Sequence, residues 1–355
     1  MNIFKRFYCR VFQKTIYCFT FLLNFREPKI IDGQNAVSKI PEVLKNCHKF
    51  RPLIVTDKGI HSLGLDKKIT KALDDAGFKH SLYSDVVPNP TFDVIEAALE
   101  IYKKDNCDCI IALGGGSSMD AAKSVGARVV NPNKELSRFK GVLKVRKQLP
   151  LLIAIPTTAG TGSESTAVAV IVNPVNHDKF TIDDTKLIPH FAVLDDSLLE
   201  ALPQNVIAYT GMDTLTHAIE AYIGKASTKK CSRYALESLK LISENLLDFY
   251  KDSKNHKARA NMQKAAYLAG VAFTRCYVGY CHALSHAIGG LSNSAHGLIN
   301  ATLLPYVLEI YGSSTYEKLA DIASAIGLGK RTDSAQSRAF ALINYIKELN
   351  DKMGI

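Results

Sequence analysis

The sequence lacks several features that would assign it to specialised classes of protein. No internal repeat and no low-complexity segment occurs in it, which excludes a solenoid or a disordered linker protein. The cysteines include no Cys-x-x-Cys pair and show no paired-loop spacing, so we expect free thiols in a reducing cytoplasm. The eight cysteines are Cys9, Cys18, Cys47, Cys107, Cys109, Cys231, Cys276 and Cys281.

The chain also lacks any motif typical of nucleic-acid binding, although its formal net charge is +10. Much of the excess lies in the first thirty residues, and elsewhere basic residues are interspersed with acidic ones. We therefore expect no nucleic-acid partner, and we interpret the charge as a solvated surface that also favours an anionic cofactor. With 355 residues the chain can form about two domains, each with a full core.

Residues 1–25 form a predicted amphipathic extension. Apolar residues recur at helical spacing from Ile3 to Leu23, with basic residues on the other side. The apolar segment is too short to span a bilayer, and no small-residue cleavage site follows it. The sequence leaves open whether the helix lies on a membrane surface, on a partner, on its own domain or on a sister subunit.

Residues 26–204 show alternating strands and helices. Expected strands are 52–57, 80–85, 109–113, 151–155 and 191–195, with helices at 69–77 and 91–104. This rhythm predicts a parallel α/β sheet that binds a ligand at the carboxyl ends of its strands. Residues 205–355 read as helices only, at 206–223, 230–250, 257–274, 277–289, 298–310, 316–326 and 334–353. The expected fold is thus a nucleotide-binding α/β domain followed by an all-α domain.

A glycine-rich segment, Gly114 to Asp120, follows the strand at 109–113. Glycines allow a phosphate to approach the backbone, and we expect Ser117 and Ser118 to cap the following helix. The segment matches neither the Rossmann fingerprint, because Met119 occupies the third glycine position, nor a P-loop. It predicts an anion site, with a plain tight turn as the alternative.

Two clusters of histidines suggest a metal site. His282 and His286 stand four residues apart, and His296 follows where the chain re-enters a helix. Upstream, Asp213 and His217 share a helical face by the same spacing. An i, i+4 ion pair would explain Asp213 and His217 alone, but the clusters together favour a divalent transition ion such as iron or zinc.

Together these segments resemble the iron-containing (group III) alcohol dehydrogenase family. The resemblance runs from about Gly33 to the end and rests on GGGSSMD, PTTAGTGSE, GMDTLTHAIE and the HALSHAIGG to SAHGLINATLLP block, in the family's order. It implies the dehydroquinate synthase-like fold of that family. The implied activity is metal-dependent, NAD(H)-linked interconversion of an alcohol, expected to be primary and short-chain, with its aldehyde.

The resemblance also implies roles for individual residues. The implied metal ligands are Asp213, His217, His282 and His296, and His286 is implied to be a catalytic residue beside the nicotinamide that relays a proton. The implied dinucleotide-binding residues are Asp57, Asn89, Gly115, Gly116, Ser117, Asp120, Thr157, Thr158, Thr161 and Lys179. A carboxylate at Asp57 would repel a 2′-phosphate, so NAD is expected rather than NADP. Fe²⁺ is the expected ion, with Zn²⁺ as the alternative, and a homodimer or larger homo-oligomer is expected.

The sequence departs from the family pattern at both ends. Residues 1–25 lie outside the common core, and the chain stops at Ile355, where family members are expected to continue for a few dozen residues. Two alternatives to the alcohol dehydrogenase therefore stay open. One is a zinc-dependent polyol dehydrogenase of the glycerol type, and the other is a truncated, non-catalytic scaffold tethered by its N-terminal helix.

Overall fold

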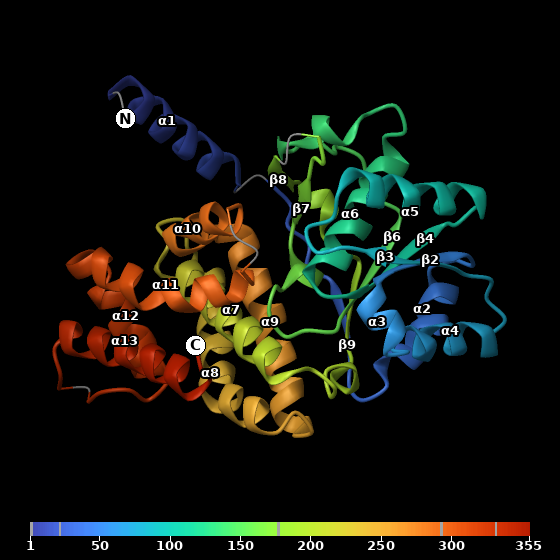
Figure 1. Cartoon of the computed structure of the whole chain (residues 1–355). Coiled ribbons are helices and arrows are strands. Elements are labelled where there is room, and N and C mark those ends of the chain that lie inside the picture. Colours follow the sequence, from blue (N-terminus) through green and yellow to red (C-terminus); the bar gives the residue numbers. More distant parts are fainter. Residues whose placement is uncertain (1–2, 21–22, 176–177, 292–293, 331) are drawn as a thin grey trace.

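The computed structural model describes residues 3–20, 23–175, 178–291, 294–330 and 332–355, and within the first helix the side chains of residues 4–11, 14 and 15. In Figure 1 a sheet-containing part lies on the right and a helical part on the lower left. The first helix, α1 (Ile3–Thr20), extends away from both. Among the residues described, no helix combines the length and apolar character that a bilayer crossing requires.

The main sheet is six-stranded and parallel, in the order β1-β9-β6-β4-β2-β3. Its strands are β1 (Lys29–Asp32), β2 (Pro52–Asp57), β3 (Ser81–Val86), β4 (Cys109–Gly114), β6 (Leu151–Pro156) and β9 (Phe191–Leu194). A smaller sheet has the order β5-β8-β7, from β5 (Gly141–Val142), β7 (Val168–Val172) and β8 (Lys179–Asp183). The predicted parallel sheet is confirmed, whereas β1 and the β7–β8 hairpin were not predicted.

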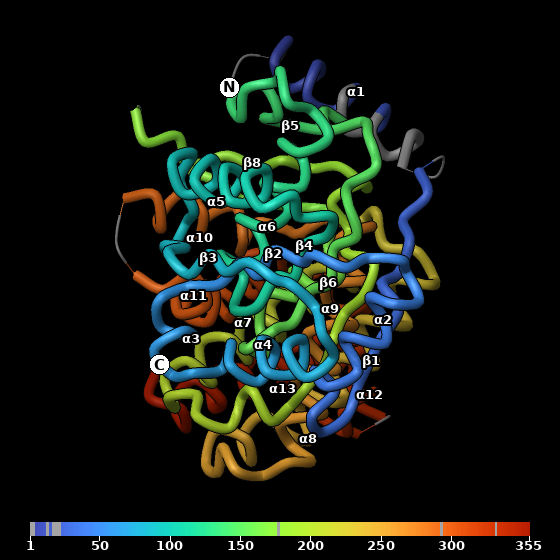
Figure 2. Tube along the Cα trace, turned by 90° about the vertical axis from the view of Figure 1, so that its right-hand side faces the viewer, coloured from blue at the N-terminus to red at the C-terminus, as the bar shows by residue number. Residues whose placement is uncertain are grey.

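Helices cover both faces of the main sheet, as the alternation of apolar side chains requires. Those in this part are α2 (Ile40–Asn46), α3 (Lys58–Ser62), α4 (Asp66–Asp75), α5 (Phe92–Lys104) and α6 (Gly116–Val130). Figure 2 shows α5 and α6 on one side of the strands and α3 and α4 on the other. Along β2, Leu53 and Val55 belong to the core under α5 and α6, whereas Ile54 belongs to the core on the opposite face.

The second half of the described chain is helical, as predicted. Its helices are α7 (Gln204–Ile223), α8 (Lys229–Lys251), α9 (His256–Cys276), α10 (Tyr280–Gly289), α11 (His296–Tyr311), α12 (Tyr316–Ala325) and α13 (Ala335–Lys352). The core that contains Ile54 and Ile153 of the sheet continues into Met212 of α7 and Leu304 of α11. One apolar core therefore joins the sheet to the helices and fixes the carboxyl edge of the sheet relative to α7.

The prediction that all cysteines are free thiols is wrong for one pair. Cys231 and Cys276 form a disulfide. Helices α8 and α9 pack side by side as a hairpin, which brings the start of α8 next to the end of α9, a proximity that no local spacing reveals. The free thiols among the described side chains are Cys9, Cys47, Cys107, Cys109 and Cys281. The side chain of Cys18 lies outside the described part.

Candidate metal centre and dinucleotide groove

Helix α7 carries the first two candidate ligands. Its central turns are buried on all sides, and Asp213 and His217 lie there at i and i+4. The distance from His217 Nδ1 to Asp213 Oδ2 is 4.0 Å. The His217 ring stacks on Phe273 of α9, with ring centroids 4.3 Å apart, so packing fixes its orientation.

The third candidate ligand, His282, is held in place by a carboxylate of α7. Glu220 Oε2 accepts hydrogen bonds from His282 Nδ1 at 2.6 Å and from Gly279 N at 2.7 Å. Glu220 Oε1 accepts from Cys281 N at 2.8 Å, so the same side chain satisfies the exposed N–H groups at the start of α10. This arrangement leaves His282 Nε2 to face Asp213 Oδ1 at 3.7 Å.

The fourth candidate, His296, is the first residue of α11, as the sequence predicted. Gly297 allows the close approach, because a Cβ there would lie 2.2 Å from Tyr209 O of α7. His296 Nε2 lies 3.8 Å from Asp213 Oδ1, and its Nδ1 is 3.0 Å from Ser285 Oγ. The structure therefore brings the three candidate histidines around the carboxylate of the remaining candidate, Asp213.

The electrostatics of the cluster centre on Asp213. Burial alone would raise its pKa, but the imidazoles of His217, His282 and His296 hold the pKa well below its usual range. Burial lowers the pKa of His217 to about 3. Burial also opposes protonation of His282, but the neighbouring carboxylates of Asp213 and Glu220 prevail and raise its pKa to about 9. The cluster thus contains a buried carboxylate that stays ionised and that a cation would neutralise.

These residues fit a divalent ion. One donor atom each of Asp213, His217 and His282 lies within 4.8 Å of the others, and all three residues are buried. His217 Nδ1 and His282 Nε2 are buried without a hydrogen-bond partner, a costly state that a metal ion would relieve. His296 is outside this closest set, and its Nε2 lies 3.1 Å from Asn300 Nδ2, which donates to Asp213 Oδ1.

His286 lies at the exposed edge of the cluster. Its ring centroid is 4.9 Å from that of His296 and 6.5 Å from that of His282. Desolvation by the surrounding groups, together with both histidines, lowers the pKa of His286 to about 4, so the ring is neutral at neutral pH. A neutral imidazole beside the cluster and open to solvent can accept a proton.

The glycine-rich turn lies at the carboxyl edge of the sheet, as predicted. Gly114 has a φ of +143°, and a Cβ there would lie 2.4 Å from Ser118 Oγ. The expected serine caps are wrong: α6 begins at Gly116, so both serines lie inside its first turn. Ser118 Oγ instead donates to Asp57 Oδ2, and Ser117 Oγ accepts from Asn89 N at 3.3 Å. The start of α6 is thus open to an anion, with Asp57 beside it.

The segment after β6 faces this turn. Thr157 N donates to Gly114 O at 3.0 Å, a Cβ at Gly115 would contact the Thr158 side chain, and one at Gly116 would lie 3.0 Å from Thr161 Cγ2. The expected groove residues on α6 and this segment therefore meet.

Asp120 points away from solvent into a hydrogen-bond network. It accepts from Ser163 Oγ at 3.1 Å and from Val170 N at 3.0 Å. The buried Lys123 donates to Ser163 Oγ and Thr166 Oγ1, each at 2.9 Å. These bonds tie α6 to the segment that carries Thr158 and Thr161, so Asp120 lies behind the groove.

Lys179, the first residue of β8, is close enough to both halves of the site for its charge to act on them. Its positive charge would attract an anion. Burial raises the pKa of Asp120, and the charge of Lys179 limits that rise. The same charge adds to the burial that lowers the pKa values of His286 and His296. Its own pKa is lowered, because it is partly buried. A cation in this position would face both the groove and the histidine cluster.

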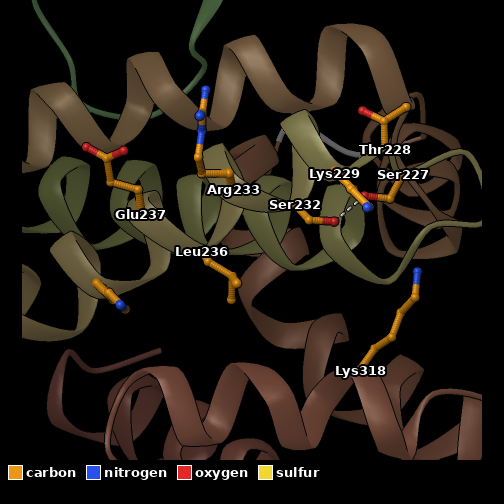
Figure 3. A pocket seen from close by; sticks show the side chains of 9 residues that line it. Ser227, Thr228, Lys229, Ser232, Arg233, Leu236, Glu237 and Lys318 are labelled. Atoms are coloured by element: carbon orange, nitrogen blue, oxygen red, sulfur yellow. Dashed lines mark hydrogen bonds between the residues drawn. The ribbon is translucent and has the colours of Figure 1, made fainter.

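A separate pocket of about 780 Å³ lies away from these residues, at the start of α8 (Figure 3). Its basic lining includes Lys229, Arg233 and Lys318, but Lys318 Nζ already donates to the carbonyl groups of residues 222–224 at the end of α7. That cation completes the helix terminus, and we assign the pocket no ligand.

Comparison with protein families decides which of the known classes this arrangement represents. The family model for iron-containing alcohol dehydrogenase matches residues 27–196, and the model for the C-terminal part of the same family matches residues 207–355. The chain belongs to the iron-containing alcohol dehydrogenase family. The resemblance inferred from the motifs is confirmed, and with it the fold class and the assignment as an oxidoreductase.

Individual members of the family agree with this assignment. The chain is 34% identical to the NAD-dependent methanol dehydrogenase of Bacillus methanolicus over 331 residues, which is 93% of this chain and 87% of that protein. A crystal structure of 1,3-propanediol oxidoreductase matches with a TM-score of 0.91 and 34% identity, covering 94% of this chain and 87% of that one. The sulfoacetaldehyde reductase of Bifidobacterium kashiwanohense, solved with NAD⁺, matches with a TM-score of 0.84 and 28% identity, covering 94% and 86%.

Sequence reasoning missed three residues of the site in this iron-containing alcohol dehydrogenase. Glu220 follows Asp213 at i+7 and His217 at i+3, so helical spacing places it on the same face of α7 and could have identified it. Asn300 stands four residues after His296 and could have been found in the same way. Ser285 gives no such signal, because its contact with His296 depends on how α10 packs on α11.

Proposed function

We propose that this protein is a metal-dependent, NAD(H)-linked oxidoreductase that interconverts a short primary alcohol and its aldehyde by hydride transfer. The proposed metal ligands are Asp213, His217, His282 and His296, with Fe²⁺ as the preferred ion. The observation that carries the proposal is the ionised, buried Asp213 carboxylate among imidazole nitrogens that have no hydrogen-bond partner. The activities named for the similar methanol dehydrogenase and 1,3-propanediol oxidoreductase support the substrate class.

A bound divalent ion supplies a Lewis acid, which favours the alkoxide form of an alcohol and polarises an aldehyde carbonyl group. Asp213 contributes the negative charge that holds such an ion, and Glu220 keeps the proton of His282 on Nδ1. His286 is the proposed proton relay, accepting the hydroxyl proton at a ring nitrogen at the edge of the cluster. Residues that exclude bulk water and orient these groups come from the packed helices α7, α10 and α11.

The proposed dinucleotide groove consists of Asp57, Asn89, Gly115, Gly116, Ser117, Thr157, Thr158, Thr161 and Lys179, with Asp120 supporting it from behind. The open start of α6 supports a pyrophosphate site, because N–H groups at a helix start attract anions. Asp57 supports NAD over NADP, since its carboxylate would accept from a ribose hydroxyl and repel a 2′-phosphate.

A zinc-dependent polyol dehydrogenase is the second candidate. One observation favours it: the closest donor set contains only Asp213, His217 and His282, while His296 contacts Asn300. A set of three protein ligands with an open position is typical of catalytic zinc.

The remaining parts of the proposal concern organisation. We propose domains at 26–204 and 205–355, a cytoplasmic location and a homodimer or larger homo-oligomer. The separation of sheet and helices along the chain supports the domains. The free thiols of Cys9, Cys47, Cys107, Cys109 and Cys281 support a reducing compartment, whereas the Cys231–Cys276 disulfide does not. Light scattering of the purified protein would measure the oligomeric state.

Metal analysis of anaerobically purified protein, combined with NADH oxidation assays, tests the function. Short aldehydes and dihydroxyacetone serve as substrates, with Fe²⁺ or Zn²⁺ added. Near-stoichiometric iron and iron-dependent aldehyde reduction are expected. Zinc-dependent reduction of dihydroxyacetone would favour the polyol dehydrogenase, and NADH binding without turnover under any condition would favour a scaffold. The variant His282→Ala should lose metal and turnover together, and full activity without metal would contradict the scheme.

A further inference from the structure

Helix α1 carries an apolar face that remains exposed. Phe4, Phe7, Tyr8 and Val11 stand at i, i+3, i+4 and i+7, so they lie on one side of the helix. Their exposed fractions are 78%, 71%, 67% and 48%. Figure 1 shows the helix extending away from the sheet and from the helical part. The family models match from residue 27 onward, so the shared activity does not account for this helix.

The charge of α1 is of one sign. Lys5, Arg6, Arg10 and Lys14 accompany the apolar face, and no Asp or Glu occurs between Ile3 and Thr20. Other surface helices differ, since α4, α5 and α8 each mix acidic with basic residues. A helix with exposed aromatic residues on one side, whose charged residues are all cations, complements an anionic surface that has an apolar layer beneath it.

Residues 25–27, which follow α1 in the sequence, are bound to the body by several hydrogen bonds. The Arg26 guanidinium donates to the carbonyl groups of Ile188 and Pro189. Arg275 Nη2 donates to Phe25 O at 2.8 Å and to Glu27 Oε1 at 3.1 Å. Residues 25–27 are therefore held beside the end of α9, and a surface bound by α1 would hold the enzyme near it.

We propose that α1 binds the interface of an anionic phospholipid bilayer, lying in its plane. The apolar face would enter the acyl boundary, and the Lys and Arg side chains would contact lipid phosphates. Binding in the plane of the interface does not require α1 to cross the bilayer, and α1 is not long and apolar enough to do so. A second copy of this chain fits the helix less well, because it carries the same basic helix and a net charge of +10.

Vesicle flotation of the full-length, metal-loaded protein tests the proposal. The vesicles contain phosphatidylcholine alone or an equimolar mixture with phosphatidylserine. We expect partition onto the anionic vesicles only, weakening as salt is added. Each cation near such a surface contributes about fivefold, so the double variant Arg6→Gln/Arg10→Gln should lower the partition coefficient by about 25-fold.

A matched control removes the same charge elsewhere. Lys103 and Lys104 are exposed at the end of α5, and Lys103→Gln/Lys104→Gln changes the net charge equally. This variant should partition within about twofold of the wild type, because cations distant from the surface are screened. A third variant, Phe7→Ser/Val11→Ser, should lose binding at unchanged charge. All three should keep wild-type aldehyde reduction in solution.

Several outcomes would overturn the proposal. They are failure of the wild type to float with anionic vesicles, equal partition onto neutral vesicles, and equal losses in the α1 and α5 charge variants. A fourth is a fall in oligomeric mass when residues 1–25 are deleted, with lipid binding unchanged, which would make α1 a contact between subunits. None of these outcomes depends on the proposed dehydrogenase activity.

Discussion

Replacing Glu220 by glutamine should weaken metal binding through His282. The carboxylate accepts from His282 Nδ1, Gly279 N and Cys281 N at 2.6, 2.7 and 2.8 Å. A glutamine offers one carbonyl oxygen and an NH₂ group, which cannot accept. Whichever way the amide points, at least one of these donors loses its acceptor, and the negative charge opposite the His282 ring disappears.

The size of the effect follows from these contacts. An orphaned buried donor together with a lost hydrogen bond to a charged group costs about 3 kcal/mol of folding free energy. A carboxylate that orients a ligating histidine typically contributes 10- to 100-fold to metal affinity, which sets the expected loss at roughly that range. Both effects should appear together, because the same side chain holds the start of α10 and the tautomer of His282.

Chelator competition for Zn²⁺ and Fe²⁺ measures the affinity, and urea unfolding of the metal-free protein measures the stability. Glu309→Gln is the matched control. Glu309 is exposed on α11 and pairs with Lys347 Nζ at 2.7 Å, a surface pair worth less than about 1 kcal/mol. Wild-type metal affinity in Glu220→Gln, even with reduced stability, would refute the reasoning and would leave Glu220 with only its role at the start of α10.

Three further predictions follow from the packing. Gly297→Ala should lower the free energy of unfolding by about 2 kcal/mol or more and weaken metal binding, because its Cβ would meet Tyr209 O and displace the start of α11. Urea unfolding and chelator competition measure the two effects, and wild-type values in both would contradict the close approach of α11 to α7. Lys123→Met should lower the free energy of unfolding by about 3 kcal/mol, since the buried Ser163 and Thr166 hydroxyl groups lose their cationic donor. It should also raise KM for NADH with less effect on kcat, because Lys123 supports the groove from behind; an unchanged KM would show that it does not. Burial lowers the pKa of His190 to about 4, and its Nδ1 accepts from Leu152 N. The unfolded chain takes up this proton near pH 6.5, so stability should fall as pH drops from about 6.5 towards 4, and His190→Asn should show a shallower decline in urea midpoints over that range.

Much of the fold was predictable because it depends on local patterns. The short apolar run of β2, at Pro52–Asp57, was predicted with its observed bounds. The helix that contains Asp213 was placed within two residues at its start, since helical spacing and Pro203 mark its beginning. The β7–β8 hairpin was missed, because glycines and hydroxyl residues precede it and no turn signal of the usual two-residue kind separates its strands.

The candidate site was predictable where ligands share a helix. Asp213 and His217 were expected on one face, and His217 Nδ1 lies there 4.0 Å from Asp213 Oδ2. Spacing could not show that Ser118 would bind Asp57 rather than cap α6, because that contact joins the first turn of α6 to the end of a different strand, β2. The disulfide between Cys231 and Cys276 was unpredictable for the same reason.

The sequence by itself determined the residue chemistry of this protein, the succession of an α/β part and a helical part, and the family to which it belongs. These depend on side-chain type and on spacings of two to four residues, which can be read from the sequence without any tertiary contact. The tertiary structure alone decided that His296 approaches Asp213, through the space left by Gly297, and that Glu220 orients His282. It alone also showed that α1 stands away from the body. Such contacts depend on how helices pack through a shared core, and that packing is set by many distant residues together.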